Sequence, residues 1–431
     1  MTREMIKNVN RRQFLGGAAK TVGAILAFPT FITTNALGGR GGVPASDRIN
    51  FGAIALGSRG STDLRAFKSY DDVVFVANCD VRRTQRETIK RTIDTQYNSD
   101  IQSYYDFREL LERKDIDAVL SASSDRNHAL IAIYAMRAGK DIYSEKPGSM
   151  TIEQGQKLVN TQKRTGRIYQ GGAQRMSENN FIFANELVRL GKLGEVKTVV
   201  AELATMGGSP YMTNNYREEQ PLPPKEEFWW DGWLGACPWR PFNASTSRND
   251  FDFYCSNIGE WGSHTHPQAM DAIGVNNTGP VEVKYVDNNT AEGMTFLFPN
   301  GKEMVIRQRL QPSQCAVQYE GSEGWVGVGD NGREVRPQSL MSEYNKIVTD
   351  YRERTGRRGD HVRDLLDCIR SRRQTTTPTE VVHRSMSTVH IGNICMWLKR
   401  DLKFDPVKEE FVNDDAANRL RSRAEREPWV M

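Results

Sequence analysis

A glycine-containing turn directly after an apolar run places the strongest constraint on how this chain folds. The run Ile49–Leu56 is typical of a buried β-strand, and it leads into Ala55-Leu56-Gly57-Ser58-Arg59-Gly60. This is a G-x-G-x-x-G turn with alanine in the first glycine position. The middle glycine lets the backbone approach a pyrophosphate, and the last allows the next helix to pack closely on the strand. We therefore expect a helix whose free N–H groups face a dinucleotide.

The residues after this turn continue a strand–helix alternation. Further strands are predicted at Val73–Cys79, Ala118–Ala122 and Asp141–Tyr143, and the polar stretches between them have helical length. Such alternation indicates a parallel sheet covered on both faces. The second strand ends at Asp80, about twenty residues after Gly60, where an acidic side chain accepts hydrogen bonds from ribose hydroxyls and favours NAD. Arg82 and Arg83 follow at once and would suit a 2′-phosphate, so NADP stays open.

The pattern changes after about residue 170. Alternating segments and turns such as Pro299-Asn300-Gly301 indicate a mostly antiparallel sheet, with closing helices near the carboxyl end. Residues 205–257 are irregular and rich in aromatic residues and proline, as binding insertions often are. The predicted fold class is α/β, with an N-terminal doubly wound Rossmann domain over residues 48–170. A C-terminal α+β domain with a large, open, mainly antiparallel sheet follows over residues 171–431.

The first 36 residues resemble an export signal. Arg11-Arg12-Gln13-Phe14-Leu15 precedes a mildly apolar run, and Thr34-Asn35-Ala36 offers a small-residue cleavage site. We expect a twin-arginine signal peptide over residues 1–36, a flexible lead-in over 37–47 and a periplasmic protein. The alternative is an ordinary amphipathic N-terminal helix.

Composition excludes several classes of protein. Lys+Arg exceed Asp+Glu by only 58 − 54 = 4, and no long basic run occurs, so nucleic acid is not an expected partner. No apolar stretch reaches the length of a membrane span, so no stable membrane anchor is expected. The six cysteines are scattered without a CxxC pair. His264 and His266 lack a third ligand at a usual spacing, so we predict no metal site.

Two further segments carry reactive side chains. Glu145-Lys146-Pro147 ends a strand of the first domain, and Glu260-Trp261-Gly262-Ser263-His264 follows the aromatic insertion. With Ser123–His128 (SSDRNH), Gly172–Arg175 (GAQR) and Trp230–Trp239 (WDGWLGACPW), they make the chain resemble the Gfo/Idh/MocA family. That family is the glucose-fructose oxidoreductase and inositol dehydrogenase group. The match runs from about residue 48 to the carboxyl end, with two departures: Ala55 replaces a glycine, and Glu260 replaces the usual aspartate.

This resemblance implies NAD or NADP as cofactor, a carbohydrate or cyclitol substrate, and a homo-oligomer, either a dimer or a tetramer. Carried over by motif, Lys146 contacts the reacting hydroxyl and the nicotinamide ribose, and His264 is the general acid/base with Glu260 beside it. Further residues are expected near the cofactor: Gly57, Ser58, Arg59, Gly60, Asp80, Ser123, Asn127, His128, Glu145 and Gln174. We interpret Tyr211, Arg248 and Tyr254 as substrate contacts.

Three functions remain open at this point. The first is an exported oxidoreductase that oxidises a ring hydroxyl, perhaps at C3, on a tightly bound nicotinamide cofactor. The second is a redox-neutral glycoside hydrolase that oxidises C3 transiently, eliminates the leaving group and adds water. The exported hydrolases of this superfamily resemble that scheme, but they carry Tyr-Pro-Thr-His where this chain has Trp-Gly-Ser-His, and they lack the E-K-P lysine. A non-catalytic sugar sensor is the third, and the intact Lys146/His264 pair argues against it.

Overall fold

A computed structural model describes residues 43–203, 215, 217–246, 250–286, 293–308 and 316–431. The chain divides into two units, Met1–Arg48 and Ile49–Met431. The described end of the first unit holds one short 3-10 turn, η2 (Ala45–Asp47). All that follows concerns the second unit. Among the described helices, none combines the length and the apolar character needed to cross a membrane.

The amino-terminal half of this unit is built on a six-stranded parallel sheet with strand order β3-β2-β1-β4-β5-β6. The strands are β1 (Ile49–Ile54), β2 (Val73–Cys79), β3 (Gln102–Tyr104), β4 (Ala118–Ser121), β5 (Asp141–Ser144) and β6 (Tyr169–Gly171). The helices between them are α2 (Ser58–Phe67), α3 (Arg83–Tyr97), α4 (Phe107–Glu112), α5 (Asp125–Arg137) and α6 (Ile152–Thr165). This is the doubly wound order, which confirms the predicted Rossmann domain.

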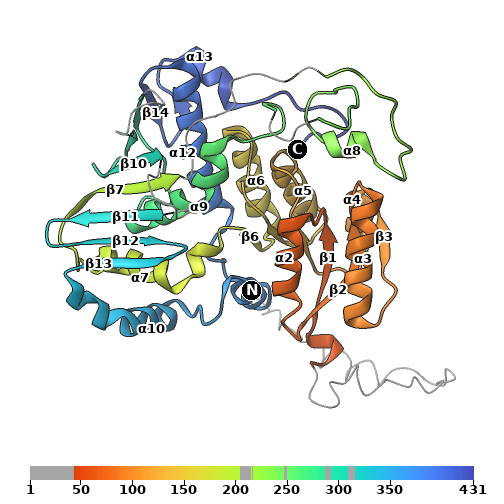
Figure 1. Ribbon diagram of the computed structural model, residues 1–431, viewed down its shortest axis with the longest axis horizontal. Coiled ribbons are helices and arrows are strands. Elements are labelled where there is room, and N and C mark those ends of the chain that lie inside the picture. Colours follow the sequence, from red (N-terminus) through yellow and green to blue (C-terminus); the bar gives the residue numbers. More distant parts are fainter. Residues whose placement is uncertain (1–42, 204–214, 216, 247–249, 287–292, 309–315) are drawn as a thin grey trace, which may run out of the picture. The chain divides into compact units, whose positions relative to one another are not determined.

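Both faces of the parallel sheet are buried. Side chains of α2 and α3 share an apolar core with α11 (His361–Ser371) on one face, and those of α4, α5 and α6 share another core on the opposite face. The strand order reverses between β1 and β4. In open α/β sheets, ligands bind beyond the carboxyl ends of the strands at this reversal. The turn that precedes α2 and the start of α5 therefore lie where a dinucleotide would bind (Figure 1).

The carboxyl-terminal half contains a nine-stranded sheet with order β13-β12-β11-β7-β10-β9-β8-β14-β15. Its strands are β7 (Val196–Leu203), β8 (Glu282–Lys284), β9 (Met294–Leu297), β10 (Glu303–Gln308), β11 (Ala316–Gly321), β12 (Trp325–Gly329), β13 (Gly332–Arg336), β14 (Leu402–Asp405) and β15 (Glu410–Phe411). Strands β7 and β10 pair in parallel, and the other pairs are antiparallel. The prediction of a mainly antiparallel second sheet is thus confirmed.

Helices of the second half join the two sheets. They are α7 (Asn179–Arg189), α8 (Trp230–Leu234), α9 (Asn257–Ala272), α10 (Tyr344–Thr355), α12 (Thr379–Leu398) and α13 (Asp415–Asn418), with 3-10 turns η3 (Gln174–Ser177), η4 (Gln338–Glu343) and η5 (Arg419–Arg421). Helix α9 packs on β7 and on α12, and α12 also packs on α6 (Figure 1). This packing holds α9 beside the carboxyl end of β5, where the reactive residues of both halves meet.

Candidate active site

The glycine turn after β1 has the geometry that a pyrophosphate requires. Ala55 occupies the first glycine position with a left-handed φ of 54°, a conformation that costs alanine more than glycine. A Cβ built on Gly57 meets nothing within 4 Å, whereas one on Gly60 lies 2.9 Å from Ala122 and from Leu56. Gly57 therefore leaves open space at the start of α2, and Gly60 allows the close packing of α2 against β4. The first N–H groups of α2 have no intrahelical acceptors, so this turn fits a dinucleotide phosphate.

Asp80 follows β2 at the same edge of the sheet and is 9% exposed. Its Oδ1 accepts a hydrogen bond of 2.8 Å from the Arg82 backbone N–H. Burial raises the pKa of Asp80 to about 6, and the Arg82 hydrogen bond opposes this rise. The carboxylate is therefore mostly ionised at neutral pH and is a hydrogen-bond acceptor beside the turn.

The two arginines after Asp80 are held by the aromatic insertion. The Arg82 guanidinium lies 4.7 Å from the Phe228 ring centroid. Arg83 forms ion pairs of 2.7 Å with Glu87 and 2.6 Å with Glu227. The sequence left Arg82 and Arg83 open as ligands of a 2′-phosphate. In the structure, Arg83 is already paired with two carboxylates.

Glu145 connects the turn to the second half of the protein. It is 3% exposed, and its Oε1 accepts hydrogen bonds from Arg59 Nε at 3.2 Å and from Gln174 Nε2 at 2.5 Å. The hydroxyl of Tyr143 also donates to it, at 3.4 Å. Two of the residues predicted near the cofactor, Arg59 and Gln174, thus both contact a third, Glu145.

A second carboxyl group joins this cluster, and sequence analysis missed it. Asp63 forms a 2.6 Å ion pair with Arg59 one helical turn away on α2. Burial and the nearby Glu145 charge raise the pKa of Asp63 to about 8. Two buried carboxyl groups therefore compete for one guanidinium, which favours a proton on Asp63 at neutral pH. The i, i+4 spacing of Arg59 and Asp63 was the available sequence signal.

The loop after β4 and the first turn of α5 contribute the next three predicted residues. Ser123 is half-buried and Asn127 is buried, with Asn127 Nδ2 donating to the Trp233 carbonyl at 3.4 Å. His128 is 2% exposed, and burial lowers its pKa to about 3, so its ring is neutral. Asn127 Oδ1 and His128 Nδ1 are buried and have no hydrogen-bond partner among the described residues. Such unsatisfied atoms beside the strand reversal are compatible with a ligand there.

Lys146 and Glu260 meet across the two halves. Lys146 Nζ forms a 2.7 Å ion pair with Glu260 Oε1 and also donates to the Glu260 carbonyl at 3.3 Å. An ammonium has three N–H donors, so one remains for a ligand. Glu260 and His264 are four residues apart on α9, on the same face of that helix. The structure therefore brings the three residues predicted to be catalytic to one edge of the parallel sheet.

The surroundings of His264 keep its ring neutral. Burial lowers its pKa well below the usual value, and the charges of Lys146, Arg175 and Arg59 lower it further. Its Nδ1 is buried and has no hydrogen-bond partner among the described residues. A neutral imidazole can accept a proton from a ligand. The cations around it would stabilise a negative charge that develops on that ligand.

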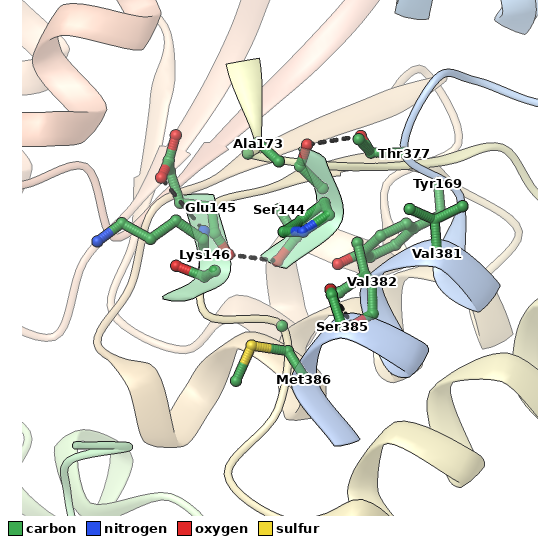
Figure 2. Close-up of a pocket in the computed structure, with 15 residues that line it drawn as sticks. Ser144, Glu145, Lys146, Tyr169, Ala173, Thr377, Val381, Val382, Ser385 and Met386 are labelled. Carbon is green, nitrogen blue, oxygen red and sulfur yellow. Dashed lines mark hydrogen bonds between the residues drawn. The ribbon is translucent and has the colours of Figure 1, made fainter. Parts of the chain in front are cut away.

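Behind Lys146 lies a small pocket of about 10 Å³ between β5, β6, α9 and α12. In Figure 2, the side chains of Glu145 and Lys146 extend to one side, and Tyr169, Val382 and Ser385 lie on the other. Pro267, inside α9, has no N–H to donate to the Ser263 carbonyl one turn earlier. Ser263 and Pro267 both line this pocket, which at this volume holds about one water molecule.

Other predicted residues lie elsewhere or outside the described chain. Tyr211 and Arg248 fall outside the described residues. Tyr254 precedes α9, and its hydroxyl donates to Asn257 Oδ1 at 2.9 Å. His266 is fully buried, with its ring centroid 6.3 Å from that of Phe296. Across the described ranges, no group of three His, Cys, Asp or Glu side chains is placed to hold a metal ion.

Comparisons with known proteins identify the family of this chain. The model of the oxidoreductase family's NAD-binding Rossmann fold matches residues 49–173, and the model of its C-terminal alpha/beta domain matches residues 186–431. Among curated relatives, myo-inositol 2-dehydrogenase of Thermotoga maritima is 29% identical over 147 residues, which is 34% of this chain and 42% of the relative. A glycosyl hydrolase family 109 protein of Shewanella baltica is 28% identical over 211 residues, 44% of each protein.

Solved structures share the fold. An aldose-aldose oxidoreductase from Caulobacter crescentus matches with a TM-score of 0.57 at 16% identity, covering 83% of this chain and 100% of the other. The scyllo-inositol dehydrogenase from Lactobacillus casei, solved with NAD(H) and scyllo-inositol, matches with a TM-score of 0.57 at 13% identity, covering 83% and 99%. The chain spans less than half the length of the two curated relatives above. On the two family models, which together match most of its length, this chain belongs to the Gfo/Idh/MocA oxidoreductase family and carries that family's NAD-binding Rossmann domain.

Proposed function

We propose that this protein is an NAD-dependent oxidoreductase that oxidises a ring hydroxyl of a sugar, glycoside or cyclitol. The contact that carries this proposal is the 2.7 Å Lys146–Glu260 ion pair, with His264 one helical turn further along α9. It places a cation and a neutral base together beside the strand reversal. The names of the relatives, an inositol dehydrogenase and a glycosidase, support a polyol or carbohydrate substrate.

The chemistry follows from these side chains. NAD, when bound at the Gly57 turn, supplies the hydride acceptor. The free N–H of Lys146 orients the substrate hydroxyl, and Glu260 fixes the ammonium in place. The neutral His264 ring accepts the hydroxyl proton. Lys146 stabilises the negative charge that develops on the oxygen.

NAD is the expected cofactor rather than NADP. Asp80 is an acceptor for ribose hydroxyls, and its negative charge opposes a 2′-phosphate. Arg83 is committed to Glu87 and Glu227, and Arg82 lies over Phe228. These contacts leave the adenosine side of the site poorly suited to an additional phosphate.

A redox-neutral glycoside hydrolase is the second candidate, because family 109 glycosyl hydrolases are among the relatives. Both candidates use the same base and the same cofactor. They differ in whether the hydride stays on the enzyme after the product leaves.

One experiment separates the two candidates. The purified protein is mixed with a panel of sugars and aryl glycosides, and the absorbance of reduced nicotinamide is followed together with release of the aryl group. A lasting rise in reduced nicotinamide is expected for the oxidoreductase. Release of the aryl group without that rise would assign the hydrolase, and neither signal with any compound would reject both activities.

The pH dependence of turnover tests the role of His264. Because the base must be neutral and its pKa is lowered, kcat/KM should remain high as pH falls through about 6.5, the usual histidine value, and decline only at lower pH. The measurement is a profile of kcat/KM with unfolding followed at each pH, so that acid denaturation is separated from titration. An acid limb centred at or above the usual histidine pKa would contradict this prediction.

We also propose export to the periplasm, on the twin-arginine pattern at Arg11 and Arg12. Replacement of both by lysine should leave the protein in the cytoplasmic fraction, whereas the unaltered protein should be recovered from the periplasm. Equal recovery from the periplasm in both cases would argue against this signal.

A further inference from the structure

A second cavity, of about 240 Å³, lies away from the glycine turn. It is lined by α5, α6, the loop after α8 and the carboxyl-terminal segment, and its charged lining residues are Arg126, Asp252, Arg423 and Glu425. Its volume is far above the roughly 10–15 Å³ that one water molecule needs. None of Gly57, Lys146, Glu260 or His264 is among its described lining residues.

Arg126 is an unusual lining residue because its charge is buried and unpaired. It is 2% exposed, and its guanidinium lies 3.6 Å from the Trp233 ring centroid. Its Nε donates to the Trp233 carbonyl at 2.7 Å, but Nη1 has no hydrogen-bond acceptor among the described residues. No carboxylate of the described chain forms an ion pair with it. Burial lowers the pKa of Arg126 to about 10, which reflects this lack of compensation.

Arg423 adds a second guanidinium to the wall. Its Nη1 donates to the Phe251 carbonyl at 2.7 Å, and the group lies 4.0 Å from the Phe251 ring centroid. Within the described ranges it too forms no ion pair with a carboxylate. Burial lowers its pKa, as it does for Arg126.

The two acidic lining residues are already neutralised by other cations. Asp252 pairs with Arg240 at 2.9 Å, and Asp250, which shares Arg240 at 2.6 Å, has a second cation in Arg217 at 3.1 Å. Glu425 pairs with Lys157 at 3.0 Å and accepts a hydrogen bond from the Met431 N–H at 2.9 Å. The cavity wall therefore carries two guanidinium groups that form no ion pair with a described carboxylate, although Asp125 and Asp252 act on them from further away.

We propose that this cavity binds an oxyanion, the carboxylate or phosphate group of a small ligand, between Arg126 and Arg423. Buried charges in proteins are normally paired, because removing an isolated charge from water is strongly unfavourable. A planar guanidinium is suited to paired hydrogen bonds with carboxylate and phosphate oxygens. This proposal does not depend on the proposed oxidoreductase activity.

The site lies close to the candidate active site in the chain. Asp125 precedes Arg126, and its carboxylate accepts a hydrogen bond of 3.0 Å from the Cys255 N–H just before α9. The charges of Glu260 and Lys146 both act on Asp125. A ligand held by Arg126 therefore binds beside the segment that positions the reactive pair.

Titration with inorganic phosphate and, separately, with galacturonate tests the proposal. Both are added to the full-length protein saturated with NAD, so that the glycine turn is not available to the probe, and chloride at equal ionic strength is the reference. Tryptophan fluorescence is the readout because Trp233 stacks on Arg126, and the thermal midpoint is the second readout. A saturable response to phosphate identifies a phosphate site, and one to galacturonate alone identifies a carboxylate site.

Variants locate the response. Arg126→Gln and Arg423→Gln should each weaken it by at least about tenfold, since a hydrogen bond to a charged group is lost. Arg137→Gln is the matched control, because Arg137 is an exposed arginine on the same helix. If Arg126→Gln does not fold, Arg423→Gln still tests the proposal, because Arg423 is less buried than Arg126. Equal binding in all variants, or a response no larger than that to chloride, would overturn the proposal.

Discussion

Replacement of Lys146 by methionine should lower kcat/KM by about 10²–10³, the loss typical of removing one donor that stabilises a developing negative charge. Methionine keeps much of the length of the side chain and removes the ammonium. The Gly57 turn and Asp80 are untouched, so the amount of NAD bound should change little. The measurement is kcat and KM for the substrate found in the sugar panel, together with NAD content after denaturation.

A charge effect must be separated from a catalytic one. Without Lys146, the Glu260 carboxylate loses its partner, although its side chain is 28% exposed and so partly solvated. The double variant Lys146→Met, Glu260→Gln removes that unpaired charge. If the loss came only from the isolated carboxylate, the double variant would regain activity. If Lys146 acts on the substrate, the double variant stays inactive. Full activity in the single variant Lys146→Met would mean that the active site lies elsewhere.

The dinucleotide half was predictable because its signals are local. The turn at Gly57 and Gly60, the acid at Asp80 and the apolar strands are each encoded within a few residues, and strand β2 (Val73–Cys79) has the predicted bounds. Contacts between residues far apart in the sequence could not be predicted in the same way. The meeting of Arg59 with Glu145 joins residues 86 positions apart, and no sequence pattern specifies it.

Helix α9 shows why the second half was harder to predict. It was not predicted, because Gly259, Gly262 and Pro267 are poor helix formers and interrupt the pattern. The packing of α9 overrides that local preference: the Cβ of an alanine at Gly262 would lie 2.2 Å from His266 Nδ1 on the same helix and 3.2 Å from Val389 on α12, so a residue without a side chain fits here. The resemblance placed Glu260 and His264 in one motif, and only the helix shows that they share a face.

The unpaired arginine of the second cavity could not be predicted from the sequence. Arg126 was part of the quoted Ser123–His128 segment, yet nothing in the sequence marks it as an unpaired buried charge. That property depends on which carboxylates have already paired with Arg240 and Lys157, and it emerges only in three dimensions. The spacing of residues in the sequence can suggest which side chains are reactive. Whether a buried charge is paired can be decided only when all of its neighbours in the structure are known.

Alanine at Gly57 is expected to weaken NAD binding by about tenfold or more while leaving the free energy of unfolding within about 0.5 kcal/mol of its original value. The added Cβ meets no protein atom within 4 Å, and the φ of −73° at this residue is accessible to any amino acid. The methyl group would instead occupy the space through which a pyrophosphate reaches the N–H groups of α2. Calorimetric titration with NAD and urea unfolding measure the two effects separately.

Gly60→Ala is the matched variant, and it should lower the free energy of unfolding rather than the affinity for NAD. Its Cβ would lie 2.9 Å from Ala122 and Leu56, well inside normal contact distance, in the packing of α2 against β4. Overpacking costs about 1–3 kcal/mol, and alanine's better helix propensity offsets about 1 kcal/mol of that. We therefore expect a net loss of about 0–2 kcal/mol in unfolding free energy. If instead both variants bound NAD as tightly as the original protein, the cofactor would not approach this turn, because no dinucleotide phosphate can contact the α2 N–H groups without passing close to Gly57.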